Sequence, residues 1–393
     1  MKIAGQSPAP FFYNWTMEIF KIDRISVKNF KSLADFEISD IPMFSCLIGI
    51  NGSGKTTFLQ FLDFVKSLMN SNVRQWVNEQ GLNNVTELLT LGGERKYSID
   101  IEIDATLGEK KASWKAKFNT REMRCTVETL REGVVEYRYE SGKLNISEPS
   151  KKIQVIDYGP SNYSGSIFSF RETGFSKFIR QCRFLGVLDP HAIAQSSLVS
   201  KAQSASVESN GRNLSGFIAG LSADNQRNLL TQIQSFYAPL KNMEIKRKQF
   251  GWKSLLLSEL EKSVFSATNL SYGTLRLFVL LSQQFTDDKV ILFDEVENGL
   301  NQELFEKFVA KLQNYGEPKK QVIVSTHSGL FLNYLTDEQA RSGVFFLYKD
   351  KIGHTHVRRF FDIPQMSEKL NVLGPGEAMG DTDLIELSDQ LSD

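Results

Sequence analysis

The feature that most constrains how this chain folds is a glycine-rich segment, Gly49–Thr56, with the sequence GINGSGKT. An apolar run of strand length, Met43–Ile48, leads into it, and an apolar helical pattern, Thr57–Leu68, follows it. Glycines let the backbone curl until successive N–H groups converge at a helix N-terminus, where an anion is stabilised. Strand, glycine loop and helix in this order predict a phosphate-binding loop in an α/β domain.

The positions of this segment have expected roles in binding ATP together with Mg²⁺. The Lys55 ammonium is expected to neutralise the β- and γ-phosphates, which also gives it a catalytic role, and the Thr56 hydroxyl is expected to bind Mg²⁺. The residues predicted to hold the nucleotide are Gly49, Asn51, Gly52, Ser53, Gly54, Lys55, Thr56 and Thr57.

A second buried strand, Val290–Phe293, ends in two carboxylates, Asp294 and Glu295. Asp294 is suited to hold Mg²⁺, and Glu295 is suited to act as the general base that aligns an attacking water. A solvated strand end could carry the same residues, but the phosphate-binding loop upstream favours the functional interpretation. The two elements together predict a P-loop NTPase.

Composition limits the class of protein more weakly. The 393 residues include 46 Lys and Arg against 46 Asp and Glu, and 41% are hydrophobic, which argues against a disordered or a uniformly basic protein. The longest apolar runs, such as Leu277–Leu281, are far shorter than the roughly 20 residues of a membrane span. Three cysteines without CxxC spacing predict a cytoplasmic protein with no disulfide framework and no cysteine-rich zinc site.

The hydrophobic pattern divides the chain into segments of different character. We expect residues 1–17 to be a disordered leader, residues 18–350 to form the ATPase domain, and residues 351–393 to form a C-terminal segment with an acidic tail. Helices are predicted around Leu214–Leu221, Asn225–Tyr237 and Lys253–Lys262, and an amphipathic one at Leu304–Leu312. The ATPase domain is predicted to consist of a phosphate-loop lobe (18–84), an inserted antiparallel β subdomain (85–158), a helical lobe (159–265) and a last lobe with the acidic strand (266–350).

Two further motifs flank the acidic strand. The sequence LSYGT, Leu270–Thr274, opens an apolar helix that comes before the acidic strand in the chain. His327, in the sequence STHS, ends a strand that comes after it. In this order the motifs resemble the ATP-binding-cassette (ABC) class, whose LSGGQ signature precedes the acidic strand and whose switch histidine follows it. LSYGT departs from that signature at Tyr272 and Thr274.

The resemblance implies how these residues act. Ser271, with the N–H groups of Gly273 and Thr274, would form a second anion site at a helix N-terminus. In the ABC class such a site reaches the γ-phosphate held by a partner, so a homodimer encloses two ATP molecules, and higher oligomers are compatible with it. The resemblance also implies a catalytic role for His327 and a dimer contact at Asn298–Asn301. A plain N-cap at Ser271 and an ordinary strand-end histidine are the alternatives.

The segment Ile22–Leu33, which contains NFKSL, resembles the first strands of SMC-, RecF- and OLD-like ATPases. No heptad pattern lasts three heptads, so we expect no long coiled-coil arm, and we expect no C-terminal Toprim nuclease. The resemblance is greatest to the compact, Toprim-less ATPases of bacterial defence systems. It implies an α/β ABC-ATPase head with a mixed central sheet, an inserted antiparallel β subdomain and a helical lobe.

The same resemblance implies an ATP-dependent dimeric switch or clamp in antiphage defence or another DNA-linked process, with a separate effector protein, a nuclease or a toxin. A non-catalytic, ATP-bound assembly scaffold is the alternative. The nucleotide-binding subunit of a membrane transporter is disfavoured by the β insertion and by LSYGT. The glutamine loop of the class could contain Gln154, Gln181 or Gln195, and the sequence does not choose among them.

A local basic patch could contact DNA or RNA, although an exposed protein face would have the same composition. Its residues are Lys241, Lys246, Arg247, Lys248 and Lys253, around Phe250 and Trp252. Residues 371–393 contain six acidic residues and no Lys or Arg, so the other 370 residues carry 46 basic against 40 acidic residues, a balance of +6. The acidic tail is therefore expected to compete for the patch.

Overall fold

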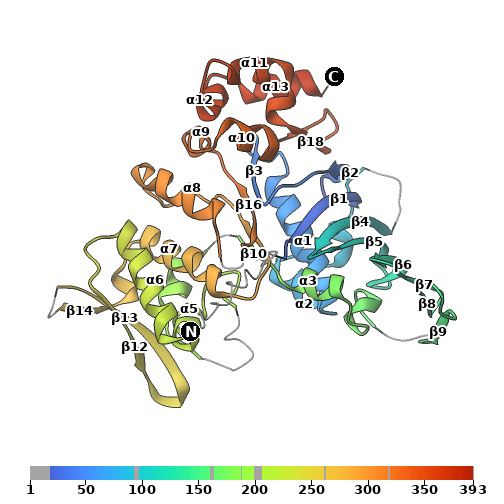
Figure 1. The fold of residues 1–393 in the computed structure, drawn as a ribbon, viewed down its shortest axis with the longest axis horizontal. Helices are drawn as coiled ribbons and strands as arrows, with labels where there is room; N and C mark the ends of the chain where they lie inside the picture. The colour runs from blue at the N-terminus through green and yellow to red at the C-terminus, as the bar shows by residue number, and fades with distance from the viewer. Residues whose placement is uncertain are drawn as a thin grey trace, which may run out of the picture.

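Three lobes surround a central sheet in the computed structural model of the chain (Figure 1). The predicted leader, residues 1–17, lies outside the described residues. Among the helices that are described, none combines the length and the hydrophobicity that crossing a bilayer requires. The structure describes residues 18–92, 97–159, 163–186, 188–198, 206–260, 263–316 and 319–392.

The central sheet is mostly parallel. Its strands in the described part of the chain are β3 (Phe44–Ile48), β10 (Cys182–Leu185), β15 (Val290–Phe293), β16 (Gln321–Ser325), β17 (Val344–Lys349) and β18 (Thr355–Arg359). They follow the order β10-β15-β16-β3-β17-β18, and the edge pair β17 and β18 is antiparallel. Both faces of a parallel sheet are covered, which explains why every residue of β15 and β16 is buried.

The strand order brings distant parts of the sequence to one edge of this sheet. Because β15, β16 and β3 are parallel neighbours, their carboxyl ends lie at the same edge. The glycine-rich segment follows β3, Asp294 and Glu295 follow β15, and His327 follows β16. Ligands of open α/β sheets bind beyond this edge, so the topology gathers these predicted site residues where a ligand is expected.

A second sheet, antiparallel throughout, lies beside the first (Figure 1). Its described strands are β1 (Phe20–Phe30), β2 (Leu33–Ile38), β4 (Ser98–Leu107), β5 (Lys110–Asn119), β6 (Arg124–Glu132), β7 (Val135–Glu140), β8 (Lys143–Ser147) and β9 (Gln154–Asp157). They follow the order β2-β1-β4-β5-β6-β7-β8-β9. Strands are present where the β subdomain was predicted, but their sheet also includes β1 and β2. The domain boundaries drawn from the sequence stay a prediction.

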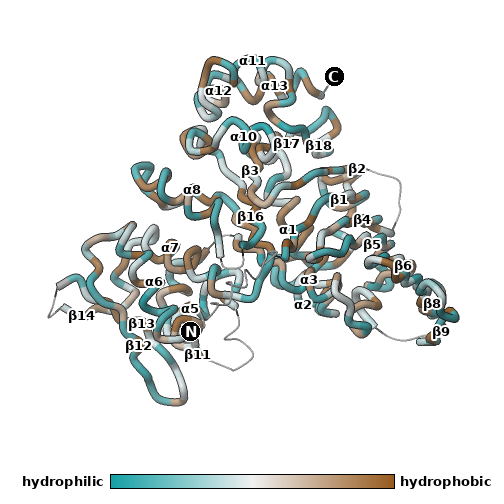
Figure 2. Tube along the Cα trace, viewed as in Figure 1, coloured by the Kyte–Doolittle hydropathy of each residue, from teal (hydrophilic) through white to brown (hydrophobic). Residues whose placement is uncertain are grey.

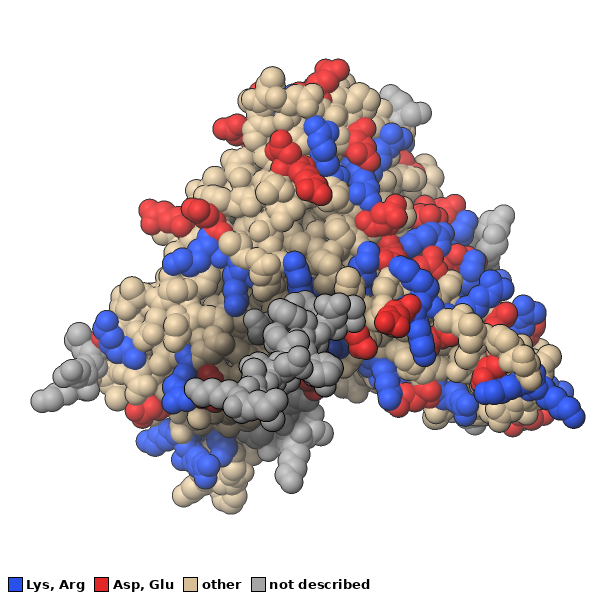
Figure 3. Space-filling model, viewed as in Figure 1, with Lys and Arg blue, Asp and Glu red and all other residues tan. Residues whose placement is uncertain are grey.

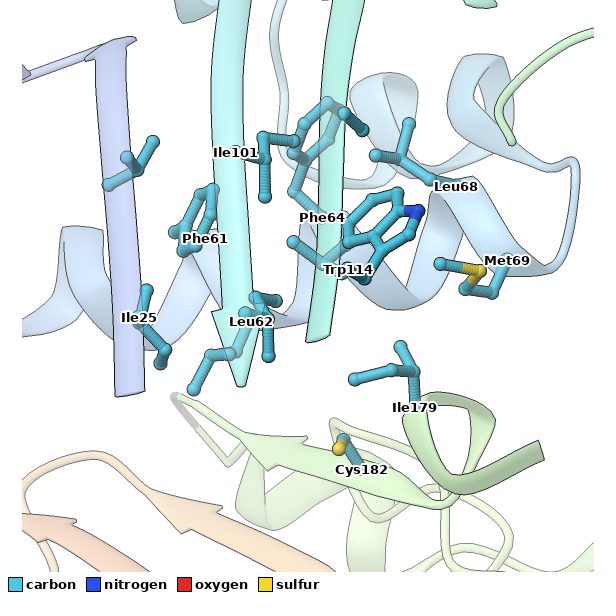
Figure 4. Close-up of a cluster of buried hydrophobic side chains, with 14 of the residues drawn as sticks. Ile25, Phe61, Leu62, Phe64, Leu68, Met69, Ile101, Trp114, Ile179 and Cys182 are labelled. Atoms are coloured by element: carbon cyan, nitrogen blue, oxygen red, sulfur yellow. The ribbon is translucent and has the colours of Figure 1, made fainter. Parts of the chain in front are cut away.

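Helix α1 (Lys55–Met69) connects the glycine-rich segment to the antiparallel sheet. Phe61 contacts Phe30 of β1, and Phe64 contacts Phe118 of β5, with ring centroids 5.3 and 5.2 Å apart. Figure 4 shows the α1 side chains facing the strands of that sheet. Such aromatic pairs contribute about 0.5–1.5 kcal/mol each beyond the area they bury, so the helix that begins at the glycine-rich segment is firmly anchored. Two short helices, α2 (Val73–Glu79) and α3 (Gly174–Arg180), complete this lobe.

A buried glutamine joins the two sheets. The side chain of Gln321 at the start of β16 accepts a hydrogen bond from the N–H of Ile22 at 2.8 Å and donates to the carbonyl of Ile22 at 2.9 Å. It also donates to the carbonyl of Pro42 at 3.1 Å. Gln321 is fully buried, and losing a partner of a buried polar group costs about 1–3 kcal/mol. The first strand of the chain is therefore fixed to a strand 299 residues later.

The lobe at the lower left of Figure 1 contains four helices and four short strands in its described part. The helices predicted around Leu214–Leu221 and Asn225–Tyr237 are confirmed as α5 and α6. The elements are α4 (Pro190–Ala194), β11 (Ser197–Leu198), α5 (Leu214–Gly220), α6 (Ala223–Phe236), β12 (Asn242–Arg247), β13 (Trp252–Leu260), β14 (Ser263–Ser266) and α7 (Tyr272–Ser282).

The helix predicted at Lys253–Lys262 is wrong over its described part, because residues 253–260 belong to β13. Leu255 and Leu257 are buried at a spacing of two, which is the period of a strand, and both pair with β12. Residues 159–265 are therefore not purely helical, and they also supply β10 to the central sheet. The three consecutive leucines carry no period of their own, so only the pairing partner reveals the strand.

The remaining helices follow β15 in the sequence. Along α8 the tube alternates between hydrophobic and hydrophilic residues (Figure 2), which confirms the amphipathic helix predicted at Leu304–Leu312. The helices are α8 (Phe305–Gln313), α9 (Gly329–Leu332), α10 (Asp337–Gly343), α11 (Pro364–Leu370), α12 (Pro375–Gly380) and α13 (Leu384–Leu391).

The acidic tail is folded rather than free over its described residues. Glu377 accepts a hydrogen bond from the N–H of Gly374 and so caps α12, and Asp381 forms an ion pair with Lys369 at 3.1 Å. Leu387 of α13 is buried. The tail lies in the uppermost lobe of Figure 1, whereas β12 and β13 project from the lower left, so the expected competition of the tail for the basic patch is wrong.

Candidate nucleotide-binding site

The glycine-rich segment has a backbone that only glycine adopts easily. Gly49, Gly52 and Gly54 have φ values of 147°, 79° and 107°, in the left-handed region. A Cβ atom on Gly49 would lie 2.2 Å from the carbonyl oxygen of Leu347, and one on Gly54 would lie 2.3 Å from the Oγ1 of Thr355. Conformation and space therefore both require glycine at these two positions.

Lys55 lies over the loop that precedes it. Its buried Nζ donates to the carbonyl oxygens of Gly49 at 2.9 Å and Ile50 at 3.0 Å. Burial lowers the pKa of Lys55 to about 8, although the carboxylates of Asp294 and Glu295 act in the opposite direction. An anion at the loop would favour the charged ammonium, which is what a phosphate provides.

Ser53 supplies an independent indication that the loop accepts a ligand. Its Oγ is buried and has no hydrogen-bond partner among the described residues. A buried hydroxyl normally has one, because the unmet bond costs about 1–3 kcal/mol. The other predicted loop residues, Asn51 and Gly52, are exposed, whereas Thr57 is half-buried in the first turn of α1. The loop thus fits a phosphate.

Thr56, Asp294 and Ser325 form a polar cluster that we call the metal corner. The Oγ1 of Thr56 donates to Oδ2 of Asp294 at 2.8 Å, and the Oγ of Ser325 donates to Oδ1 of the same carboxylate at 2.5 Å. No group of three His, Cys, Asp or Glu side chains in the described ranges could hold a metal by itself. Mg²⁺ usually takes one or two protein oxygens together with phosphates and waters, so the metal corner fits Mg²⁺ bound with a nucleotide.

Glu295 has an exposed carboxylate beside the metal corner. Its φ is 45°, an uncommon value for a residue other than glycine, and its N–H donates to the Oγ of Ser325 at 2.7 Å. The Nδ2 of Asn298 lies 3.4 Å from its Oε2. A left-handed backbone at a residue other than glycine costs of order 1 kcal/mol in conformational energy and turns the chain sharply. The chain therefore departs from the direction of β15 at Glu295, directly after Asp294. An accessible carboxylate at this point could accept a proton from water.

A buried arginine that the sequence interpretation missed holds both acidic residues from behind. Arg276 of α7 is 2% exposed, and its Nη2 donates to the backbone carbonyls of Asp294 at 3.0 Å and Glu295 at 2.5 Å. Its Nη1 donates to the hydroxyl of Tyr272 at 3.1 Å. A single charge within the apolar run TLRLFVLL was the available signal, because buried arginines need partners.

The LSYGT sequence forms the signature turn, Leu270–Thr274, at the start of α7. Ser271 caps this helix, since its Oγ accepts from the N–H of Thr274 at 3.2 Å. A Cβ on Gly273 would lie 2.1 Å from the carbonyl oxygen of Gly299, so the turn packs directly on the loop that follows Glu295. Within the described residues no hydrogen bond joins Ser271 or Gly273 to residues 49–56.

His327 is exposed beyond β16, and its backbone N–H donates to Oε1 of Glu297 at 2.7 Å. Partial burial and the nearby Lys55 ammonium lower the pKa of His327, so its imidazole is neutral at pH 7. Glu297 was not predicted from the sequence; its Oε2 is buried without a hydrogen-bond partner in the described part of the chain. Its position two residues past the predicted base was the signal that could have found it.

The family follows from a match to a sequence model once this geometry is known. The model for the RecF/RecN/SMC N-terminal domain matches residues 21–350. The chain belongs to this family. Its members are ABC-type ATPases that typically hydrolyse ATP. No curated protein matches the chain.

Solved SMC heads have a similar fold. A crystal structure of an SMC head bound to the C-terminal winged-helix domain of ScpA has a TM-score of 0.56 at 13% identity, covering 86% of this chain and 96% of that one. The Pyrococcus furiosus SMC head with an extended coiled coil, bound to the C-terminal domain of ScpA, has a TM-score of 0.50 at 12% identity, with the same coverage. At such identities the likeness shows the fold alone, and it confirms the predicted α/β head.

The head fold separates the three glutamine candidates. Gln154 begins β9 at the far edge of the antiparallel sheet, and Gln181 precedes β10 at its amino end. Gln195 follows α4, beyond the carboxyl end of β10, where the backbone of Leu185 accepts from the N–H of Asp294 at 3.0 Å. Gln195 is therefore the candidate on the side of the sheet where the site residues gather.

Proposed function

We propose that this chain is an ATPase that binds ATP with Mg²⁺, dimerises around it and uses hydrolysis as a switch. The observation that carries the proposal is the metal corner, in which Thr56 from the phosphate loop reaches Asp294 from the acidic strand at 2.8 Å. Residues 238 positions apart thereby meet at a loop that has the features of a phosphate site. A structural polar contact alone would leave the buried hydroxyl of Ser53 unexplained.

The roles of the residues follow from their positions. The loop N–H groups and Lys55 would hold the phosphates, and Thr56 with Asp294 would hold Mg²⁺, which when bound neutralises charge on the β- and γ-phosphates. The carboxylate of Glu295 would take a proton from the attacking water. The neutral imidazole of His327, on the neighbouring strand end, would donate or accept a hydrogen bond near the same water.

The dimer is part of the proposal because the signature turn lies apart from the phosphate loop of its own chain. Ser271 is exposed, and among the described residues its side-chain hydroxyl hydrogen-bonds to Thr274 of its own turn. A second copy related by a two-fold axis would place each signature turn against the phosphate loop of the other copy. Two ATP molecules would then lie between the subunits, with Ser271 and Gly273 at the γ-phosphates.

Replacing the proposed base tests the function directly. Glu295→Gln should keep ATP affinity within about twofold, because the loop and the metal corner are intact, and should lower kcat by at least about 100-fold, the usual contribution of a general base. Light scattering should show a dimer that persists with ATP. Glu306→Gln, an exposed glutamate of α8, is the matched control. Unchanged hydrolysis, or a monomer at saturating ATP, would contradict the proposal.

The biological setting is proposed from the resemblance in the sequence. It favours a cytoplasmic switch in antiphage defence or another DNA-linked process, with a nuclease or toxin as a separate effector. The solved SMC heads were crystallised with a domain of another protein, which supports a protein partner for this head as well. Plaque counts on cells carrying the chain with its neighbouring genes should rise to the level without defence for Glu295→Gln, and equal protection by both forms would contradict this setting.

A further inference from the structure

The strands β12 and β13 form a hairpin, Asn242–Leu260, that projects from its lobe (Figure 1). Near its base Met243 and Ile245 pack against the buried cluster of the lobe. The part near the turn has no such cover, since Lys246, Arg247, Lys248, Gln249 and Phe250 are all exposed. The tip of the hairpin is thus held out into solvent by a base that is anchored.

The tip concentrates positive charge that no ion pair among the described residues offsets. Residues 241–253 contain five Lys and Arg and one carboxylate, Glu244, and Figure 3 shows Lys and Arg gathered at the end of this lobe. Arg247 pairs directly with Lys253 across the hairpin, an arrangement of like charges that destabilises a sheet. Among the described residues neither has an ion pair. An anion bound there would remove this repulsion.

Two aromatic side chains accompany these cations. Phe250 is 89% exposed in the turn and has a φ of 56°, while Trp252 is 40% exposed at the start of β13. Exposing a large aromatic ring forfeits about 1.5–3 kcal/mol of burial, so two adjacent ones are unusual without a ligand. The left-handed backbone at Phe250 adds strain to the turn. The next residue, Gly251, has no side chain that could cover the ring.

The register of the hairpin places aromatic and basic groups on one face. The N–H of Lys248 donates to the carbonyl of Trp252 at 2.8 Å, so these two residues are cross-strand neighbours, and Lys246 lies two residues earlier on the same face. The Nζ of Lys248 donates to the Oγ of Ser196 at 2.7 Å. An open groove of about 640 Å³ runs along this face, and it is lined by Ser196, Lys246, Arg247, Lys248, Gln249 and Trp252.

We propose that the tip of this hairpin binds single-stranded nucleic acid. Phosphates would lie on Lys246 and Lys248 of this face and on Arg247, which leaves the strand on the opposite face but also lines the groove, and bases would stack on Trp252 and Phe250. Cations alone would suit an acidic protein segment or a duplex equally well. Exposed ring faces next to the cations favour unpaired bases, because every base can stack on an aromatic ring while a duplex keeps its faces covered. The proposal goes beyond the ATPase, since the groove contains none of residues 49–56, 271–273 or 294–327.

Binding can be measured without ATP, so the result is independent of the nucleotide site. Fluorescence anisotropy of a labelled 20-nucleotide oligo(dT) and oligo(rU) should show saturable binding to the full chain at 50 mM salt. Affinity should fall with log salt with a slope of about −2, which is three phosphate contacts at roughly −0.7 each for a single strand. A duplex of equal length should bind at least about fivefold more weakly, because its bases are not free to stack.

Two variants separate the charged from the aromatic contribution. The triple reversal Lys246→Glu, Arg247→Glu, Lys248→Glu should lower affinity at least about tenfold and flatten the salt slope. The pair Phe250→Ala and Trp252→Ala should lower affinity at least about fivefold and leave the slope unchanged, because stacking is not ionic. The charge-matched control, Lys110→Glu, Lys117→Glu, Lys143→Glu, alters exposed lysines of the antiparallel sheet and should change affinity less than about twofold.

Each opposite result overturns the proposal. No binding by the wild-type chain, or equal losses in the hairpin reversal and its control, would remove the hairpin as a site. Duplex binding as tight as single-strand binding, with no effect of the aromatic pair, would show a non-specific polyanion surface. Displacement by polyglutamate at equal charge concentration would show an acidic-protein site instead. Thermal melting followed by circular dichroism verifies that every variant is folded.

Discussion

The two ends of the candidate site differ in how much of the chemistry one chain completes. At the end with the phosphate loop, Thr56, Asp294 and Ser325 are already in hydrogen-bonding contact, and Lys55 lies over its own loop. At the end with the signature turn, Ser271 is exposed and bonds within its own turn. The first end is therefore organised by folding, whereas the second makes no hydrogen bond to the phosphate loop within the described part of its own chain.

The two ends are nevertheless mechanically joined. Arg276 starts in the signature helix and ends on the carbonyls of Asp294 and Glu295, and Gly273 packs on Gly299. A displacement of the signature turn would therefore move the backbone of Glu295, the proposed base of the same chain. In the proposed dimer, this connection would link the state of one nucleotide site to the geometry of the other.

Mixing two defective variants should have the largest effect. Lys55→Ala and Ser271→Glu should each lower turnover about 100-fold, because one removes a phosphate contact and the other places a charge against the γ-phosphate. A one-to-one mixture should recover about a quarter of wild-type turnover, since half of the two-fold dimers would contain one intact site of two. Steady-state phosphate release measures this, with the Lys55→Ala, Ser271→Glu double variant as the non-complementing control. No recovery would mean that the two ends do not meet between subunits.

Loosening the connection should have an intermediate effect. Arg276→Gln should lower kcat about 20-fold and change KM less than about twofold, because Glu295 would lose the bond that fixes its backbone while the phosphate loop is untouched. Arg276→Lys should recover part of kcat by keeping one donor. Steady-state kinetics beside a melting curve measures both, and a change confined to KM would refute the positioning role of Arg276.

Titrating Lys55 should have the smallest effect. The pKa of Lys55 is lowered to about 8, and the ammonium rather than the amine attracts phosphate, so ATP affinity should fall as pH rises through 8. Between pH 7 and pH 8.5 the protonated fraction of such a group drops about fourfold, which sets the expected loss. Equilibrium binding of a fluorescent ATP analogue measures it. Lys55→Arg, which stays charged, should bind more weakly at pH 7 but show a flat profile; a parallel decline would assign the titration elsewhere.

The parts of the site that could be predicted from sequence are those with local signals. The glycine spacing of residues 49–56 and the carboxylates after an apolar strand are each contiguous, and they specify their own conformations. Arg276 and Glu297 could not be predicted in the same way, because their partners lie 18 or more residues away and depend on how helix and strand pack. A buried charge can be noticed in a sequence, but not what it contacts.

The fold shows the same division. The phosphate-loop strand and the acidic strand were predicted correctly from their apolar runs, and the amphipathic helix at Leu304–Leu312 from its period. The strand β13 was missed because three successive leucines fit a helix as well as a strand. The extension of the antiparallel sheet to β1 was also missed. Strands β1 and β4 pair in the sheet, but the phosphate loop and α1 lie between them in the sequence. Register between distant strands is a property of tertiary packing, which local patterns do not encode.

The position of β3 between β16 and β17 in the central sheet has a consequence for how the chain folds while it is being synthesised. Both neighbours of β3 in the central sheet, β16 and β17, are synthesised more than 270 residues after it. During translation the phosphate-loop strand therefore has two unpaired edges for most of its time on the ribosome, a state that invites aggregation. A nascent chain that ends before Gln321 lacks β16 and cannot complete the central sheet. It therefore has no folded nucleotide site that ATP could bind and stabilise. Nucleotide binding would then report that synthesis has passed this point, and chaperone dependence should be greatest just before it.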